Sequence, residues 1–275
     1  MSISETGTRS VTVDGQRLRV SVVGKGGDPP LLLINGIGAP LELWGEFRGL
    51  LGVETIAFDA PGTGGSPAPL RPRSMWGLAH LVDGMLDELG YGTVDVLGIS
   101  WGGGLAQHVA LLRRSRVRRL VLASTGFGAG SLPASPLAVL QLLTPARYFS
   151  PSHLVRVGPN LFGGEVKRRP ELLTEQGALR SRHRPTLRGY AYQLLAASTW
   201  AALPWLRLVD AETLVLLGGD DPIVHVLNGR VLAGVLPHAT LRVVPDAGHL
   251  FLIDQPQLAA DIVGEFIRNG RAAPR

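Results

Sequence analysis

The feature that most constrains this chain is an alternation of short apolar runs with longer amphipathic segments. The runs are bounded by Gly, Pro or Asp and are too short for helices, which is typical of strands buried on both faces of a parallel sheet. Segments of helical period lie between most of them, for example at 75–89, and another follows the last run at 256–268. This order predicts a doubly wound α/β fold with a mostly parallel sheet. The runs lie at 31–34, 55–58, 94–97, 120–123, 214–217 and 241–244.

Two parts of the chain depart from this alternation. Residues 10–13 and 18–23 read as short strands joined by the turn dipeptide Asp14-Gly15, which predicts an antiparallel hairpin. From 127 to 205 the chain is rich in Pro and aromatic residues and shows no strand pattern. We expect this insertion to be a helical cap over the carboxyl edge of the sheet. The domains would be a core at 1–126, the cap at 127–205 and the second part of the core at 206–275.

Composition excludes several classes of protein. Hydrophobic residues make up 45% of the 275 residues and charged residues 18%, so the chain can bury a large core and is not disordered. The absence of Cys excludes a disulfide framework and a cysteine nucleophile. No apolar stretch is long enough to span a membrane, and the opening residues lack the pattern of a secretory signal. We therefore expect a cytoplasmic protein.

The net charge of +5 does not indicate a nucleic-acid partner. Of the 27 basic residues, 25 are Arg, which a coding bias explains as readily as a need for guanidinium groups. The densest basic run, at 113–119, contains no aromatic residue, and we interpret it as a solvated helix end. No His, Asp or Glu cluster has metal-ligand spacing, and the glycine-rich turn at 61–66 is followed by Pro rather than by a helix. We expect neither a metal nor a cofactor.

A candidate nucleophile lies in the segment Gly98-Ile99-Ser100-Trp101-Gly102. The segment follows the predicted strand at 94–97 and precedes a helical stretch, which is the context that a G-x-S-x-G elbow requires. Glycines at both ends allow a sharp turn that exposes the Ser100 hydroxyl and directs a helix N-terminus at developing negative charge. The alternative is an ordinary serine N-cap between two glycines.

A serine nucleophile needs a base and a carboxylate that orients the base. His249 and Asp221 each follow the end of a predicted strand, so both are expected at the edge of the sheet that carries Ser100. The chain order Ser100, Asp221, His249 is that of α/β-hydrolases. Two rivals stay open: His225 for the base and Asp220 for the acid, although the spacing G-x-x-D favours Asp221. Both aspartates could also serve only to cap the next helix.

Acyl transfer also needs two donors for the oxyanion of the tetrahedral intermediate. The backbone N–H of Trp101, directly after the nucleophile, is the first candidate. The second is expected in the loop that follows the run at 31–34, and we assign it to the N–H of Ile37 within Asn35-Gly36-Ile37-Gly38.

The predicted cap carries the aromatic residues that could set substrate size. We expect Phe162 and Trp200 to line the substrate cleft, and an aliphatic substrate suits such an apolar cap. The alternative is that all six aromatic residues only hold the cap together. The six are Phe149, Phe162, Tyr190, Tyr192, Trp200 and Trp205.

Several segments together resemble the intracellular depolymerases of medium-chain-length polyhydroxyalkanoates, a family of α/β-hydrolases. The resemblance covers residues 31–267, and its most specific parts are N-G-I-G, S-W-G-G and the cap strings. Two positions depart from the family pattern, because His225 stands where Pro is usual and Pro40 where Asn is expected. The segments include LLLINGIGAPLELW, IAFDAPGTGGS, VLGISWGGGLAQ, TPARYFSPSHLVRVGPNLFGG, GYAYQLL, LLGGDDPIV and AGHLFLI.

The resemblance implies a cofactor-free serine esterase with Ser100, Asp221 and His249 as its triad. Its substrate would be a polyester of 3-hydroxy acids with long alkyl side chains, and contact of the protein with polymer granules stays open. The alternatives are an esterase or lactonase for small aliphatic esters, and a low-turnover ligand-binding receptor on the same fold. The oligomeric state, and whether the polymer is cut internally or from its ends, are not predicted.

Overall fold

The computed structural model describes residues 7–24, 26, 29–132 and 135–270. Residues 1–6, which belong to the opening segment considered for a secretory signal, and residues 271–275 lie outside the described part, as do residues 133–134 of the predicted cap.

The described strands form one sheet of eight, in the order β1-β2-β4-β3-β5-β6-β7-β8. β1 and β2 form an antiparallel hairpin, β2 is antiparallel to β4, and the other neighbours are parallel. The predicted α/β-hydrolase fold, with its hairpin and mostly parallel sheet, is confirmed. The strands are β1 (Thr8–Val13), β2 (Gln16–Val23), β3 (Leu31–Ile34), β4 (Thr55–Phe58), β5 (Val94–Ile99), β6 (Val117–Ala123), β7 (Glu212–Gly218) and β8 (Ala239–Val244).

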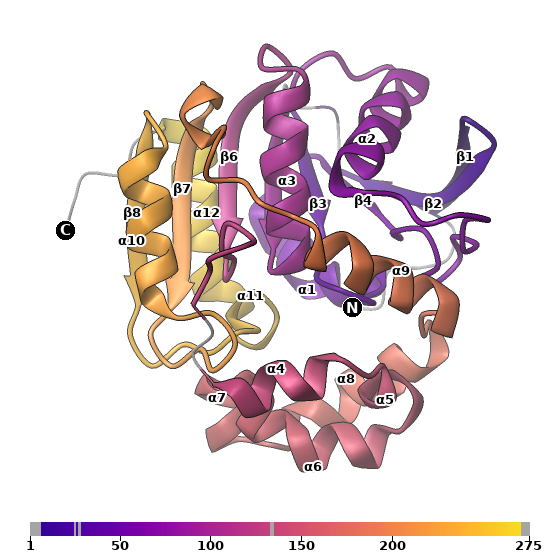
Figure 1. Cartoon of the computed structure of the whole chain (residues 1–275), viewed down its shortest axis with the longest axis vertical. Coiled ribbons are helices and arrows are strands. Elements are labelled where there is room, and N and C mark those ends of the chain that lie inside the picture. Colours follow the sequence, from indigo (N-terminus) through magenta and orange to yellow (C-terminus); the bar gives the residue numbers. More distant parts are fainter. Residues whose placement is uncertain (1–6, 25, 27–28, 133–134, 271–275) are drawn as a thin grey trace.

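Helices cover both faces of this sheet (Figure 1). α2, α3 and α10 pack on one face and α1, α11 and α12 on the other, so every residue of β3, β4 and β5 is buried. Each fully buried Leu or Ile contributes roughly 1.5–3 kcal/mol to stability. These helices are α1 (Gly45–Leu51), preceded by the 3-10 helix η2 (Leu41–Trp44), α2 (Met75–Leu89), α3 (Trp101–Leu112), α10 (Val226–Val235), α11 (Phe251–Asp254) and α12 (Pro256–Asn269).

The order of the strands creates a crevice at one place on the carboxyl edge. β3 lies between β4 and β5, so the chain leaves β3 toward one side of the sheet and later returns to add strands on the other side. Loops that follow β3 and β5 therefore diverge, and open α/β sheets bind ligands at such a switch point. The loop after β3 holds Ile37, and the turn after β5 holds Ser100.

A group of helices between β6 and β7 lies over this carboxyl edge (Figure 1). The group supplies most of an apolar cluster that includes Leu154, Leu161, Phe162 and Leu173 and that extends to Ile223 and Leu250 at the edge of the sheet. The side chains of Ser135, Ser150 and Thr186 cap the N-termini of three of its helices. The helices are α4 (Pro136–Leu142), α5 (Ala146–Phe149), α6 (Pro151–Phe162), α7 (Gly164–Arg168), α8 (Leu172–Arg182) and α9 (Leu187–Ser198), followed by the 3-10 helix η3 (Leu206–Leu208).

The basic run at 113–119 is only in part the solvated helix end that its composition suggested, because Arg113 and Arg114 are exposed after the end of α3 and the later residues are not all so. α3 ends at Leu112 and β6 already begins at Val117. Arg116 is buried and pairs with Asp83 and Asp87 of α2. These ion pairs fasten α2 to the start of β6, which Arg116 directly precedes. The other pairs of the run are Arg113–Asp83, Arg113–Asp87, Arg114–Asp210, Arg118–Asp95 and Arg119–Glu212.

None of the helices in the described part of the chain combines the length and the apolar character that crossing a bilayer requires.

Candidate active site

Ser100 stands at a strained turn between β5 and α3. Its φ is +56°, in the region that residues with a side chain rarely adopt. The turn is possible because its flanks are glycines: a Cβ on Gly98 would lie 2.2 Å from the Gly102 carbonyl oxygen, and one on Gly102 would lie 2.2 Å from the Ile34 carbonyl oxygen. The Ser100 side chain makes no capping hydrogen bond to α3, so the segment has the backbone of a nucleophile elbow rather than of an ordinary N-cap.

His249 and Asp221 form a buried pair at the ends of β8 and β7. The Nδ1 atom of His249 lies 2.8 Å from Oδ2 of Asp221, and their side chains are 5% and 0% exposed. The other oxygen of Asp221 accepts the N–H groups of Ile223 and Val224 at 2.8 and 3.0 Å. Because the carboxylate accepts from Nδ1–H, it favours the tautomer in which Nε2 of His249 is left as a base.

The two rivals considered from the sequence have other contacts. Asp220 accepts the N–H of Gly164 in the group of cap helices, at 2.9 Å. His225 is exposed and caps α10, where its Nδ1 accepts the N–H of Leu227 at 3.2 Å. Neither side chain lines the cavities that Ser100 lines.

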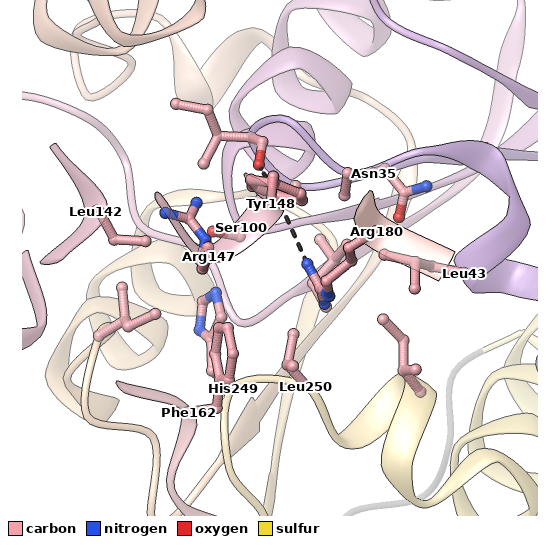
Figure 2. A pocket seen from close by; sticks show the side chains of 16 residues that line it. Asn35, Leu43, Ser100, Leu142, Arg147, Tyr148, Phe162, Arg180, His249 and Leu250 are labelled. Carbon is pink, nitrogen blue, oxygen red and sulfur yellow. Dashed lines mark hydrogen bonds between the residues drawn. The ribbon is translucent and has the colours of Figure 1, made fainter. Parts of the chain in front are cut away.

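Ser100 and His249 line the same small cavity beneath the cap helices, of about 40 Å³ (Figure 2). Between these two described side chains no hydrogen bond is formed, and such bonds often tighten only when substrate is bound. Phe162 also lines this cavity, and its carbonyl oxygen accepts the backbone N–H of His249 at 2.7 Å. The helix α6, which ends at Phe162, is thereby tied to the loop that carries the imidazole.

A second, larger cavity of about 390 Å³ adjoins the first. Its lining is mostly apolar and includes Trp200, Leu194 and Val139. Ser100 and Ile37 line both cavities, so the candidate nucleophile stands where a small and a large compartment meet. Phe162 and Trp200, the two side chains predicted to contact substrate, thus belong to different compartments.

The loop of Ile37 and the elbow are held together by a residue of α9. Gln193 is buried, and its Oε1 accepts the N–H of Gly38 at 2.8 Å. Its backbone carbonyl accepts the indole N–H of Trp101 at 2.9 Å. The Tyr148 hydroxyl, from α5, donates to the Ile37 carbonyl at 2.7 Å and thereby holds the same loop from a second cap helix. The N–H groups assigned to the oxyanion therefore belong to two segments that the cap helices fasten in place.

Sequence reasoning missed Gln193, Tyr148 and two buried arginines of the small cavity, Arg147 and Arg180. Arg147 and Tyr148 lie in one of the cap strings quoted above, but no spacing rule indicates that they face the core. Among the described residues, no group of three His, Cys, Asp or Glu side chains is arranged to hold a metal ion.

Comparisons with known proteins match this architecture. A family model described as alpha/beta hydrolase fold matches residues 29–256. The chain is 43% identical over 267 residues to the poly(3-hydroxyalkanoate) depolymerase of Ectopseudomonas oleovorans, across 96% of this chain and 93% of that protein. It is 26% identical to 3-oxoadipate enol-lactonase 2 of Acinetobacter baylyi, across 90% and 92% of the two chains. A solved hydrolase from Pseudomonas aeruginosa has a TM-score of 0.82 at 26% identity, across 96% and 99%.

Proposed function

The chain belongs to the α/β-hydrolase family and is a carboxylic ester hydrolase, and from that premise we propose that it cleaves medium-chain-length poly(3-hydroxyalkanoate). In this proposal Ser100 is the nucleophile, His249 the base and Asp221 the residue that orients the base. The observation that carries the proposal is the buried His249–Asp221 pair, whose imidazole shares a cavity with a serine at a strained elbow.

The reaction then follows from the positions of these groups. His249 takes the Ser100 proton through Nε2 while Oγ attacks the ester carbonyl, and the N–H groups of Ile37 and Trp101 receive the oxyanion. The ester C–O bond breaks, and the leaving alcohol takes the proton from His249. Water attacks the acyl-enzyme by the same steps and releases the acid together with free Ser100.

The larger cavity and the cap surface support an aliphatic polyester as substrate. The cavity is apolar enough to receive alkyl side chains. Nearby, α4 and its flank expose the apolar side chains of Leu137, Leu140 and Leu143, which are 57%, 62% and 55% exposed. Clustered exposed leucines suit contact with a hydrophobic surface. We therefore propose that the enzyme acts at the surface of polymer granules in the cytoplasm.

A small aliphatic ester or lactone is the second candidate. It is favoured by the size of the cavity shared by Ser100 and His249, which at about 40 Å³ would receive a short chain without movement of the cap helices. The relative from Acinetobacter baylyi is named as a lactonase, in line with this candidate. A ligand-binding receptor is not retained, because the chain is a hydrolase.

The test compares substrates on the purified protein. A medium-chain polyester suspension, a short-chain polyester suspension and a series of soluble esters are incubated with the wild type and with Ser100→Ala, and released hydroxy acids are quantified by chromatography. We expect release from the medium-chain polymer by the wild type only. Hydrolysis confined to soluble esters would favour the second candidate and refute the polymer.

A further inference from the structure

Two buried arginines line the small cavity together with Ser100 and His249. Arg147, in α5, is 3% exposed, and Arg180, in α8, is 2% exposed. Figure 2 shows both guanidinium groups among the side chains that surround this cavity. The cavity that holds the proposed nucleophile and base is therefore strongly basic on its cap side.

Within the described part of the chain, no carboxylate forms an ion pair with either guanidinium group. Arg147 donates to the Thr144 carbonyl at 3.0 Å and to the Tyr190 hydroxyl at 2.8 Å. Arg180 donates to the Tyr148 hydroxyl at 3.2 Å, and its contact with a Gln176 oxygen is long, at 3.4 Å. The Nε atom of Arg180 is buried without a hydrogen-bond partner among the described residues. Arg147 also interacts with the Tyr148 hydroxyl. All of these acceptors are neutral, and several of the ten N–H donors of the pair have no acceptor among the described side chains and backbone.

The other buried arginines of the chain show what a purely structural role looks like. Arg48 makes four hydrogen bonds to Ser21 and Thr55 and does not line either cavity. Arg116 is paired with Asp83 and Asp87. A buried charge that lacks such partners is strongly destabilising. Arg147 and Arg180 thus differ from the other buried arginines that the structure describes, because they combine burial, unused donors and access to a cavity.

Aromatic rings lie beside both guanidinium groups. The guanidinium carbons of Arg147 and Arg180 lie 4.8 and 5.4 Å from the centroid of the Tyr148 ring. Burial lowers the pKa of Arg180, and the charge of Arg147 acts in the same direction. Burial also acts to lower the pKa of Arg147, but interactions with Tyr148 and Tyr190 outweigh it and raise that pKa. Two like charges near one ring in an enclosed space favour an anion between them or beside them.

We propose that Arg147 and Arg180 form an anion subsite that binds the carboxylate of the substrate on the leaving-group side of Ser100. A cavity of about 40 Å³ suits a carboxylate, and guanidinium groups hold that planar group with paired hydrogen bonds. The apolar acyl chain then lies in the adjoining larger cavity. The subsite gives the hydrolase a preference for esters whose alcohol portion carries a free carboxylate.

This inference rests on the proposed function where it concerns the polymer. In a poly(3-hydroxyalkanoate), the hydroxyl of the last residue is esterified to the carbonyl of the residue before it. The free carboxylate of that last residue lies only a few bonds from this ester. Attack of Ser100 Oγ on that carbonyl breaks the C–O bond, and the terminal 3-hydroxy acid leaves with the proton from His249. The remaining chain stays on Ser100 until water releases it. The enzyme would thus remove hydroxy acids one at a time from the carboxyl end.

The kinetic test uses the linear dimer of 3-hydroxyoctanoate, either as the free acid or with its carboxylate capped as the methyl ester. We expect the wild type to prefer the free acid by about tenfold to a hundredfold in kcat/KM, the range for a charged hydrogen-bonded contact. The ratio should fall toward one in Arg147→Gln and Arg180→Gln. Arg156→Gln, an exposed arginine in α6, is the matched control and should keep the wild-type ratio. A wild-type ratio near one overturns the proposal.

A binding test separates this inference from the esterase activity. Calorimetry on Ser100→Ala measures 3-hydroxyoctanoate, the proposed leaving group, against its methyl ester, and thermal melts show whether each arginine variant is folded. The free acid should bind at least about tenfold more tightly than the methyl ester, and the added change Arg180→Gln should remove the difference. Equal binding of the two probes refutes the subsite even if the wild type hydrolyses esters. Tighter binding of the free acid, together with no hydrolysis by the wild type, leaves the subsite standing and refutes the proposed function.

Discussion

At the scale of single residues, the orientation of His249 depends on one oxygen of Asp221. The other oxygen is held by two backbone N–H groups, so the carboxylate cannot turn away from the imidazole without losing both. Asp220, its neighbour, has the same chemistry but faces Gly164. One position along the chain therefore separates a carboxylate that orients the proposed base from one that fastens a cap segment to the core.

This arrangement predicts opposite outcomes for the two matched substitutions. Asp221→Asn should lower kcat by up to about four orders of magnitude, because the amide favours the wrong imidazole tautomer. Asp220→Asn should have a much smaller effect on kcat and should act mainly on thermal stability. Initial rates with a soluble octanoate ester and melting curves measure both. A larger loss of kcat in Asp220→Asn would contradict the assignment of Asp221.

Asp254 predicts a dependence of stability on pH. Burial raises the pKa of Asp254 to about 6 from 3.8, Glu165 adds to that effect, and both carboxylate oxygens lack a hydrogen-bond partner among the described residues. A raised carboxyl pKa means that the unfolded chain ionises first, so the contribution of Asp254 to stability falls as pH rises from about 4 to about 6 and then stays level.

Asp254→Asn should remove this loss. We expect its free energy of unfolding at pH 7 to exceed that of the wild type by on the order of 1–3 kcal/mol, with little difference below pH of about 4. Urea unfolding at both pH values measures this, and Asp261→Asn, an exposed aspartate of α12, is the control. A variant that is less stable than the wild type at pH 7 would refute the expected sign.

At the scale of elements, α9 and the segment after it connect the cap helices to both cavities. Gln193 holds the loop after β3 and the start of α3, and Trp200 lines the large cavity. Trp200 lies close to the α3 backbone at Gly104, while Trp205 packs against His108 with ring centroids 4.7 Å apart. The two tryptophans are thus a natural pair for separating a substrate contact from a structural contact.

Trp200→Ala should move the preferred acyl length of soluble esters toward longer chains. Each methylene buried in the large cavity gains about 0.8 kcal/mol, or roughly fourfold in kcat/KM, until the cavity is full. Trp205→Ala should lower the melting temperature and leave the preferred length unchanged. Both are measured as kcat/KM over an ester series alongside thermal melts. An unshifted optimum in a folded Trp200→Ala would exclude this side chain from setting chain length.

At the scale of the whole molecule, the sequence predicted the elements more readily than their order. The short apolar runs are visible because β3, β4 and β5 are buried on both faces and tolerate few polar side chains. Nothing in those runs indicates that β3 lies between β4 and β5. The buried half of the basic run at 113–119 was not predicted, because its acidic partners, such as Asp83 and Glu212, lie far away along the chain.

In the candidate site, too, some residues could be predicted from the sequence and others could not. Ser100, Asp221 and His249 could be proposed from the sequence because each follows a strand end in a known chain order. Arg147 and Arg180 could not, because 25 arginines in the chain look alike in sequence and only packing distinguishes a buried one. Gln193 was missed for a related reason: its hydrogen bonds join α9 to loops that no local pattern places beside it.

The central claim is that Ser100 carries the acyl group during ester hydrolysis, and the most direct measurement is to find that group. Wild type is mixed with p-nitrophenyl octanoate, quenched in acid during the burst of p-nitrophenol, digested and analysed by mass spectrometry. We expect an octanoyl adduct on the peptide that contains Ser100, a burst that approaches one p-nitrophenol per chain, and neither in folded Ser100→Ala. Turnover that persists in that variant, or an adduct on another residue, would contradict the central claim.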